Sequence, residues 1–145
     1  MSGILGTKAS LIYDINLLLQ IAILLLLLLG YKFKRDKNLM RHGLTMAVAV
    51  ILHTIAILLV MIPSFITYFG ILLRDTASPG VTITWVHAIM GILAEILGIF
   101  LVAIWRFRPQ PKMACAKWRW LMKPLLALWT FALILGIAFY AYYYL

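Results

Sequence analysis

Five polar side chains interrupt hydrophobic stretches of this sequence at positions where they could do chemistry. They are Asn16, Gln20, His53, His87 and Glu95. A carboxylate at the centre of a lipid-embedded helix costs roughly 2.5 kcal/mol or more to insert, so such a residue is expected to have a polar partner and a function. Histidine ligates metals and transfers protons, and burial can keep a carboxyl group neutral. These residue types therefore predict a buried site for a cofactor or a proton.

Two cofactors fit this set of side chains. His53 and His87 are the candidate axial ligands of a b-type haem, because haem iron accepts imidazole nitrogen. His87 and Glu95 could instead exchange hydrogen bonds and protons with a quinone head group. A third interpretation is structural: the polar groups, Asn16 and Gln20 above all, hydrogen-bond one another and fix the helix packing. Nucleophile motifs and phosphate-binding loops are absent from the sequence, so we do not expect a hydrolase or an enzyme that works on its own.

The composition places these residues in a membrane. Of the 145 residues, 66% are hydrophobic and 12% are charged, and the mean hydropathy is +1.06. Four segments have the ~20 residues that a helix needs to cross the hydrocarbon core, namely residues 11–30, 43–62, 81–105 and 121–142. Since backbone groups in lipid must bond internally, the chain is expected to be all-α, a single integral membrane domain folded as an up-and-down four-helix bundle. Pro63 either ends or kinks the second span.

Basic residues are concentrated in two of the connections between these spans. Five of the thirteen Lys and Arg residues lie in residues 32–41 and six in residues 106–123. The positive-inside rule therefore predicts a multi-pass protein of the cell membrane with these loops in the cytoplasm and both termini outside. The net charge of +9 then reflects topology and contact with anionic membrane lipids, and nucleic acid is not an expected partner.

This topology brings the polar residues to similar depths. At a rise of ~1.5 Å per residue, Asn16 and Gln20 lie roughly 8 and 14 Å below the outer boundary. His87 and Glu95 lie roughly 9 and 21 Å below it, and His53 is roughly 15 Å from the inner boundary. The two histidines thus differ by ~6 Å in depth, which suits a haem between helices spaced ~8–10 Å apart. His87 and Glu95 are about 80° apart around their helix, so both face inward only if it has a broad interior side.

Four short motifs carry a resemblance to a known family. They are "NLLLQ" from residue 16, "RHGL" from residue 41, "TWVHAIMG" from residue 84 and "KWRWLMKPLLALWTFALILGIAFYAYYY" from residue 117. In these the chain resembles the CtaM/YozB-like family of small polytopic membrane proteins, which is associated with the maturation or function of haem-copper oxidases. The resemblance matches Asn16, His42 and His87 to family positions. Further histidines that the family carries near the outer end of the second span and in the last basic loop are absent from this sequence.

The residues and the resemblance together predict a small membrane accessory or assembly component of a respiratory electron-transfer complex. Its partners would be larger membrane subunits of that complex or another copy of itself, contacted mainly inside the membrane. The alternative is a redox subunit that binds a b-type haem between His53 and His87, or a quinone near His87 and Glu95.

Overall fold

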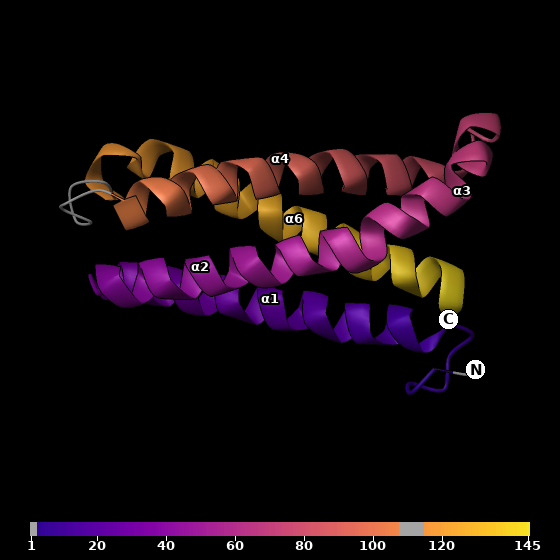
Figure 1. The fold of residues 1–145 in the computed structure, drawn as a ribbon, viewed down its shortest axis with the longest axis horizontal. Helices are drawn as coiled ribbons and strands as arrows, with labels where there is room; N and C mark the ends of the chain where they lie inside the picture. The colour runs from indigo at the N-terminus through magenta and orange to yellow at the C-terminus, as the bar shows by residue number, and fades with distance from the viewer. Residues whose placement is uncertain (1–2, 108–114) are drawn as a thin grey trace.

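The computed structural model describes residues 3–107 and 115–145, and its regular secondary structure there is entirely helical (Figure 1). The α-helices are α1 (Leu11–Arg35), α2 (Leu39–Ala56), α3 (Ile62–Arg74), α4 (Pro79–Phe107) and α6 (Arg119–Tyr144). A π-helical turn, η1 (Ile57–Met61), joins α2 to α3 without a break. Four helical segments are therefore long and apolar enough to cross a membrane, with the second running from Leu39 to Arg74. The prediction of an all-α four-helix membrane bundle is confirmed.

The four spans form a ring in which each packs against two neighbours. Helix α1 contacts α2 and α6, and α4 contacts the same two helices from the other side. The chain runs up and down, so the two termini lie at one end of the bundle (Figure 1). The basic ends of α1 and α4 lie at the opposite end, and we call this the basic end. The side of the membrane that each end faces stays a prediction from the charge pattern.

The second span differs most from its predicted range of 43–62. It begins earlier because the Asn38 side chain accepts a hydrogen bond from the backbone N–H of Arg41, at 3.2 Å, and so caps α2. It continues past Pro63 because η1 precedes this proline and changes the hydrogen-bond register just where the pyrrolidine ring would conflict with the preceding turn. Pro63 therefore kinks the span, and α3 bends away from the line of α2 toward α4 (Figure 1).

The other spans are each longer than predicted. Pro79 opens α4 at a position where proline's missing N–H costs nothing, and the helix continues to Phe107. Helix α6 begins at Arg119, so Pro124 is its sixth residue and lies inside the helix. The predicted start of this span, at residue 121, would have placed Pro124 in the first turn of the helix, and the earlier start places it beyond that turn.

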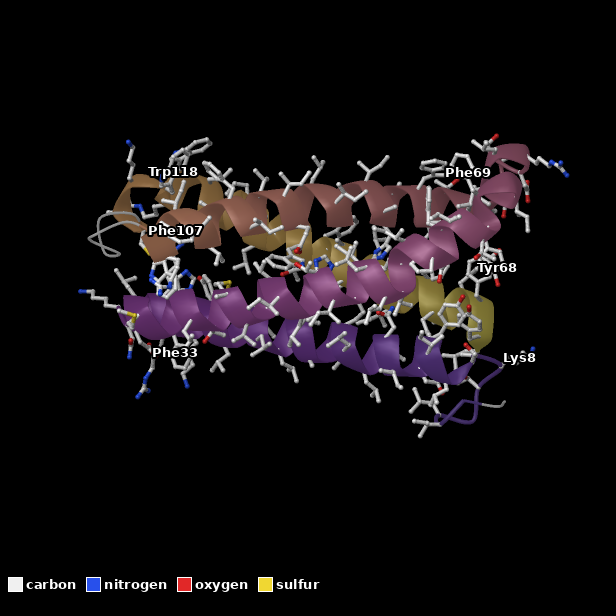
Figure 2. All side chains as sticks on the ribbon, viewed as in Figure 1. Lys8, Phe33, Tyr68, Phe69, Phe107 and Trp118 are labelled. Carbon is white, nitrogen blue, oxygen red and sulfur yellow. The ribbon has the colours of Figure 1, made fainter. Side chains whose placement is uncertain are left out.

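The interior of the bundle contains an apolar core, and the exterior suits lipid. Eight buried residues form the core cluster: Ile23, Leu27, Ala49, Val50, Ala94, Leu125, Trp129 and Leu133. Outward side chains along the middle of the bundle are hydrocarbon, while nitrogen and oxygen atoms gather between the helices (Figure 2). Phe33, Phe107 and Trp118 lie at the basic end and Tyr68 and Phe69 near the other, as expected for aromatic belts at the two membrane interfaces.

Replacing Gly43 by alanine should destabilise the bundle. A Cβ atom at Gly43 would lie 2.1 Å from Cε2 and 2.4 Å from Cζ2 of Trp105, so the indole ring of α4 would have to move. Overpacking of this kind costs about 1–3 kcal/mol, or very roughly 3–10 °C in Tm. Thermal unfolding of the detergent-solubilised protein, followed by circular dichroism, measures the change.

Gly70→Ala is the matched control, because a Cβ atom there meets nothing within 4 Å. Alanine is the better helix former, so this variant should keep or slightly raise the Tm. An equal loss of Tm in both variants would contradict the close packing of Trp105 on Gly43.

Candidate functional site

A histidine and a glutamate pair in the middle of the bundle. Nδ1 of His53, on α2, lies 2.7 Å from Oε2 of Glu95, on α4. Both residues are buried, with 2% and 7% of their surfaces exposed. The other carboxyl oxygen of Glu95, Oε1, hydrogen-bonds the hydroxyl of Thr54. In the part of the chain that the structure describes, the contact between His53 and Glu95 is the one contact within ion-pair range. We call these three residues the His–Glu–Thr centre.

The contacts of the His–Glu–Thr centre are compatible with two arrangements of its protons. The Thr54 hydroxyl carries one hydrogen but contacts two acceptors, Oε1 of Glu95 and the backbone oxygen of Val50 at 2.9 Å. If Glu95 is ionised, Thr54 donates to it. If Glu95 holds a proton on Oε1, the carboxyl O–H donates to Thr54, and Thr54 donates to Val50. In both arrangements His53 Nδ1–H can donate to Oε2, so one set of side-chain positions satisfies either arrangement.

His87 faces a different helix from Glu95. Its Nδ1–H donates to the backbone oxygen of Ala132 on α6, at 2.8 Å. A Cβ atom at Gly136 would lie 2.9 Å from Cε1 of this ring, so the glycine allows the imidazole to approach the α6 backbone. Glu95 points to α2 and His87 to α6, and α4 packs between these two helices. The broad interior side that the spacing of His87 and Glu95 required is therefore present.

Gln20 and Asn16 lie on α1 without the hydrogen-bond partners that the packing interpretation requires. Gln20 is 2% exposed, and neither its amide nitrogen nor its oxygen has a partner among the described residues. The same is true of Oδ1 of Asn16. A Cβ atom at Gly136 would lie 3.7 Å from the Gln20 oxygen, and His87 contacts the same glycine. Gln20 and His87 thus border one region of the interior, with unused donors and acceptors.

The two histidines proposed as haem ligands are not each other's nearest polar partners. His53 bonds Glu95 and His87 bonds Ala132, in both cases through Nδ1, which leaves Nε2 as the nitrogen that could ligate a metal. The His53 ring also packs on Trp129, with 5.3 Å between ring centroids, and the His87 ring packs on Gly136. Side chains and backbone of α6 therefore adjoin both rings, and a porphyrin between them would require these contacts to open.

The sequence analysis missed one member of the centre, Thr54, and one residue that covers it, Trp129. Thr54 follows His53 directly in the sequence. The carboxyl group of Glu95 lies between these two side chains and bonds one with each oxygen. Trp129 is 2% exposed and covers His53 from α6. A threonine beside an intramembrane histidine was a usable signal, because its hydroxyl can serve a buried carboxyl group. A tryptophan in an apolar span carried none, since its ordinary role there is packing.

A second buried carboxylate, also missed, lies near the termini. Asp14 is fully buried in the first turn of α1 and accepts hydrogen bonds from Tyr140 of α6 and from the backbone N–H of Leu5, the latter at 2.9 Å. The Thr7 hydroxyl lies 2.7 Å from the Tyr140 oxygen. The segment before α1 therefore folds over this end of the bundle and ties α1 to α6. A carboxylate inside a predicted span was the signal that could have found it.

Comparisons with protein-family models, with curated proteins and with solved structures found no match.

Exchanging Glu95 for glutamine should leave the fold intact, whereas alanine should not. The glutamine oxygen can accept from His53 and its NH₂ group can donate to Thr54, as a protonated glutamate does. Glu95→Ala leaves the buried Nδ1–H of His53 without an acceptor, at a cost of about 1–3 kcal/mol. Thermal unfolding in detergent compares the two. A Tm loss in Glu95→Gln as large as in Glu95→Ala would contradict the arrangement with a protonated glutamate.

Proposed function

We propose that this protein is an accessory or assembly component of a respiratory electron-transfer complex in the cell membrane, with its basic end in the cytoplasm and both termini outside. Its working part is the His–Glu–Thr centre. The observation that supports this is the pairing of two ionisable groups, His53 and Glu95, in the interior of a membrane bundle.

Packing alone does not account for the His–Glu–Thr centre. Taking a carboxylate and an imidazolium out of water costs several kcal/mol per ion, and well-packed apolar residues often replace such a pair without loss of stability. An intramembrane ionisable residue is therefore a functional candidate by default. What the centre offers chemically is a proton that moves between Glu95 and its neighbours at the depth of the hydrocarbon core. Respiratory complexes handle protons and electrons at this depth.

The partners are expected inside the membrane. Large apolar side chains are exposed along all four spans, so the surface available to lipids, to larger subunits of the complex or to a second copy of the chain is mostly hydrocarbon. The segments outside the helices are short in the described ranges. An accessory role needs no substrate pocket of its own, and it agrees with the resemblance of the sequence to proteins linked to oxidase maturation.

Complementation of a gene deletion tests this proposal. Cells without the gene should lose most of the terminal-oxidase activity of their membranes, and the wild-type gene should restore it. Glu95→Gln should restore less than about a tenth of the activity, because the amide keeps the hydrogen bonds but cannot release a proton. Oxygen uptake and the haem spectrum of the membranes are the measurements.

Ile96→Ala serves as the matched control, since this neighbour of Glu95 is exposed to lipid, and it should restore activity fully. Oxidase activity that is unchanged by the deletion would overturn the proposal. A haem band in the purified protein that His53→Ala and His87→Ala both abolish would replace the proposal with the redox-subunit alternative.

Quinone binding near His87 is the second candidate, and Gln20 favours it. The buried amide of Gln20 has neither of its polar atoms paired within the described part of the chain and lies on the same glycine as His87. An amide N–H and an imidazole Nε2 could together hold a quinone or quinol oxygen. Glu95, on the helix of His87, would supply or accept the proton.

Gln20→Leu should weaken quinone binding about tenfold if this second candidate is correct. Leucine has similar size but cannot hydrogen-bond, so the loss reports the amide. Quenching of tryptophan fluorescence by a short-chain quinone, titrated into the purified protein, measures the affinity. Ile21→Leu, at an exposed neighbouring position, should bind as wild type does. Equal affinity in Gln20→Leu and wild type would contradict the assignment.

A further inference from the structure

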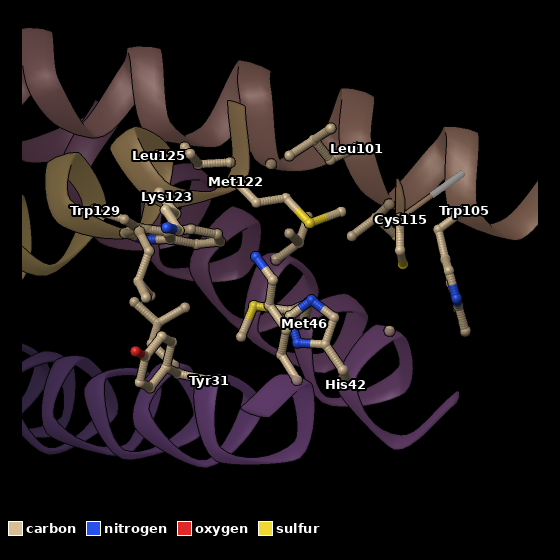
Figure 3. Close-up of a pocket in the computed structure, with 17 residues that line it drawn as sticks. Tyr31, His42, Met46, Leu101, Trp105, Cys115, Met122, Lys123, Leu125 and Trp129 are labelled. Carbon is tan, nitrogen blue, oxygen red and sulfur yellow. The ribbon is translucent and has the colours of Figure 1, made fainter. Parts of the chain in front are cut away.

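A cavity lies inside the basic half of the bundle, away from the polar layer. Its volume is about 80 Å³, and residues of α1, α2, α4 and α6 line it (Figure 3). The lining is mostly hydrocarbon and aromatic, and includes Leu27, Val50, Leu101, Leu126 and Trp129. At about 10–15 Å³ per water molecule, the space corresponds to roughly six waters. It therefore suits a stretch of a single alkyl chain and is too small for a haem.

Positive charges collect at one end of this cavity. Lys34 of α1 and Lys123 of α6 both line it, and Arg119, one turn before Lys123, adds to the positive field at Lys34. Carboxylates are absent from the lining residues. Among residues 3–107 and 115–145, no lysine or arginine is within ion-pair distance of a carboxylate. The cations at the cavity thus have no carboxylate counter-ion among the described residues.

The cavity runs along the helices, in the direction that a lipid chain takes. Trp129 is six residues beyond Lys123 on α6, which places it ~9 Å deeper along the helix axis. The Trp129 indole N–H is buried and has no hydrogen-bond partner among the described residues. A ligand would therefore meet cations at the basic end and an apolar wall with one free donor further in. This is the polarity of a lipid in the adjoining leaflet, with its head group at the interface.

We propose that this cavity binds an anionic phospholipid of the leaflet at the basic end. One acyl chain occupies the cavity, and the phosphate group lies against Lys34 and Lys123. A phosphate suits this site because lysine binds it as a point charge, and because basic pockets between membrane helices bind phospholipid head groups. Lys34 and Lys123 come from α1 and α6, so the lipid links the first span to the last.

The proposal is tested by native mass spectrometry of the full-length protein in mild detergent. The probes are phosphatidylglycerol and phosphatidylcholine with identical acyl chains. The double variant Lys34→Gln/Lys123→Gln should bind phosphatidylglycerol at least tenfold more weakly than wild type. The matched control, Lys32→Gln/Lys37→Gln, removes two exposed cations from the same end and should change the affinity less than twofold. Phosphatidylcholine should bind weakly to every form.

A variant without a charge change tests the acyl chain separately. Val102→Phe adds volume to the cavity wall and should weaken phosphatidylglycerol binding severalfold, whereas Ile99→Phe, at a lipid-exposed position, should not. Unfolding followed by circular dichroism establishes that each variant is folded. Equal losses in the two lysine pairs, or wild-type affinity in Val102→Phe, would overturn the proposal. Oleate that binds as tightly as phosphatidylglycerol would also overturn it, in favour of a free fatty acid.

Discussion

The carboxyl group of Glu95 imposes the constraint on which the centre of this bundle depends. In hydrocarbon its oxygens find no water, so each must be bonded by the protein itself. One is bonded by His53 and the other by Thr54, and both of these lie on α2. The pairing therefore sets the rotation of α2 and α4 about their axes and their relative height. A sliding movement of one turn between these helices would leave a buried acid and a buried imidazole unpaired, which makes it unfavourable.

Helix α4 distributes the interior polar groups between its two neighbours. Glu95 faces α2 and His87 faces α6, two helical turns apart. Small residues allow this arrangement. Gly136 leaves room for the His87 ring, and Gly98 packs against Trp129 and Val50. A Cβ atom at Gly98 would lie 3.1 Å from the Trp129 side chain and 3.2 Å from the Val50 side chain. Such close approach of helices at glycine is the usual source of packing energy in membranes, where apolar burial between helices gains little. The glycines and the polar residues thus act together to fix one geometry.

The parts of the structure that the sequence could predict are those that depend on composition and on residues taken singly. Long apolar segments predicted the four spans, and the insertion cost of His53, His87 and Glu95 predicted an interior site. The pairing within that site could not be predicted, because depth alone does not say which way a side chain points around its helix. Depth suggested His53 with His87, and rotation gave His53 with Glu95. The kinked second span depends on a π turn, whose energy relative to an α turn is too small to read from the residues before Pro63.

Two residues line the cavity and also contact the His–Glu–Thr centre, so the cavity and the centre are not independent parts of the molecule. Trp129 packs its ring on His53 and also lines the cavity. Val50 lines the cavity with its side chain, while its backbone oxygen accepts the hydrogen bond from Thr54. A molecule in the cavity would contact Trp129 and Val50, and these contact His53 and Thr54 directly. Because protein interiors are densely packed and deform little, a change in the occupant of the cavity acts on the two residues that hold Glu95. The physical link between the cavity and the His–Glu–Thr centre therefore runs through the Trp129 ring and through Val50, whose side chain lines the cavity and whose backbone oxygen bonds Thr54.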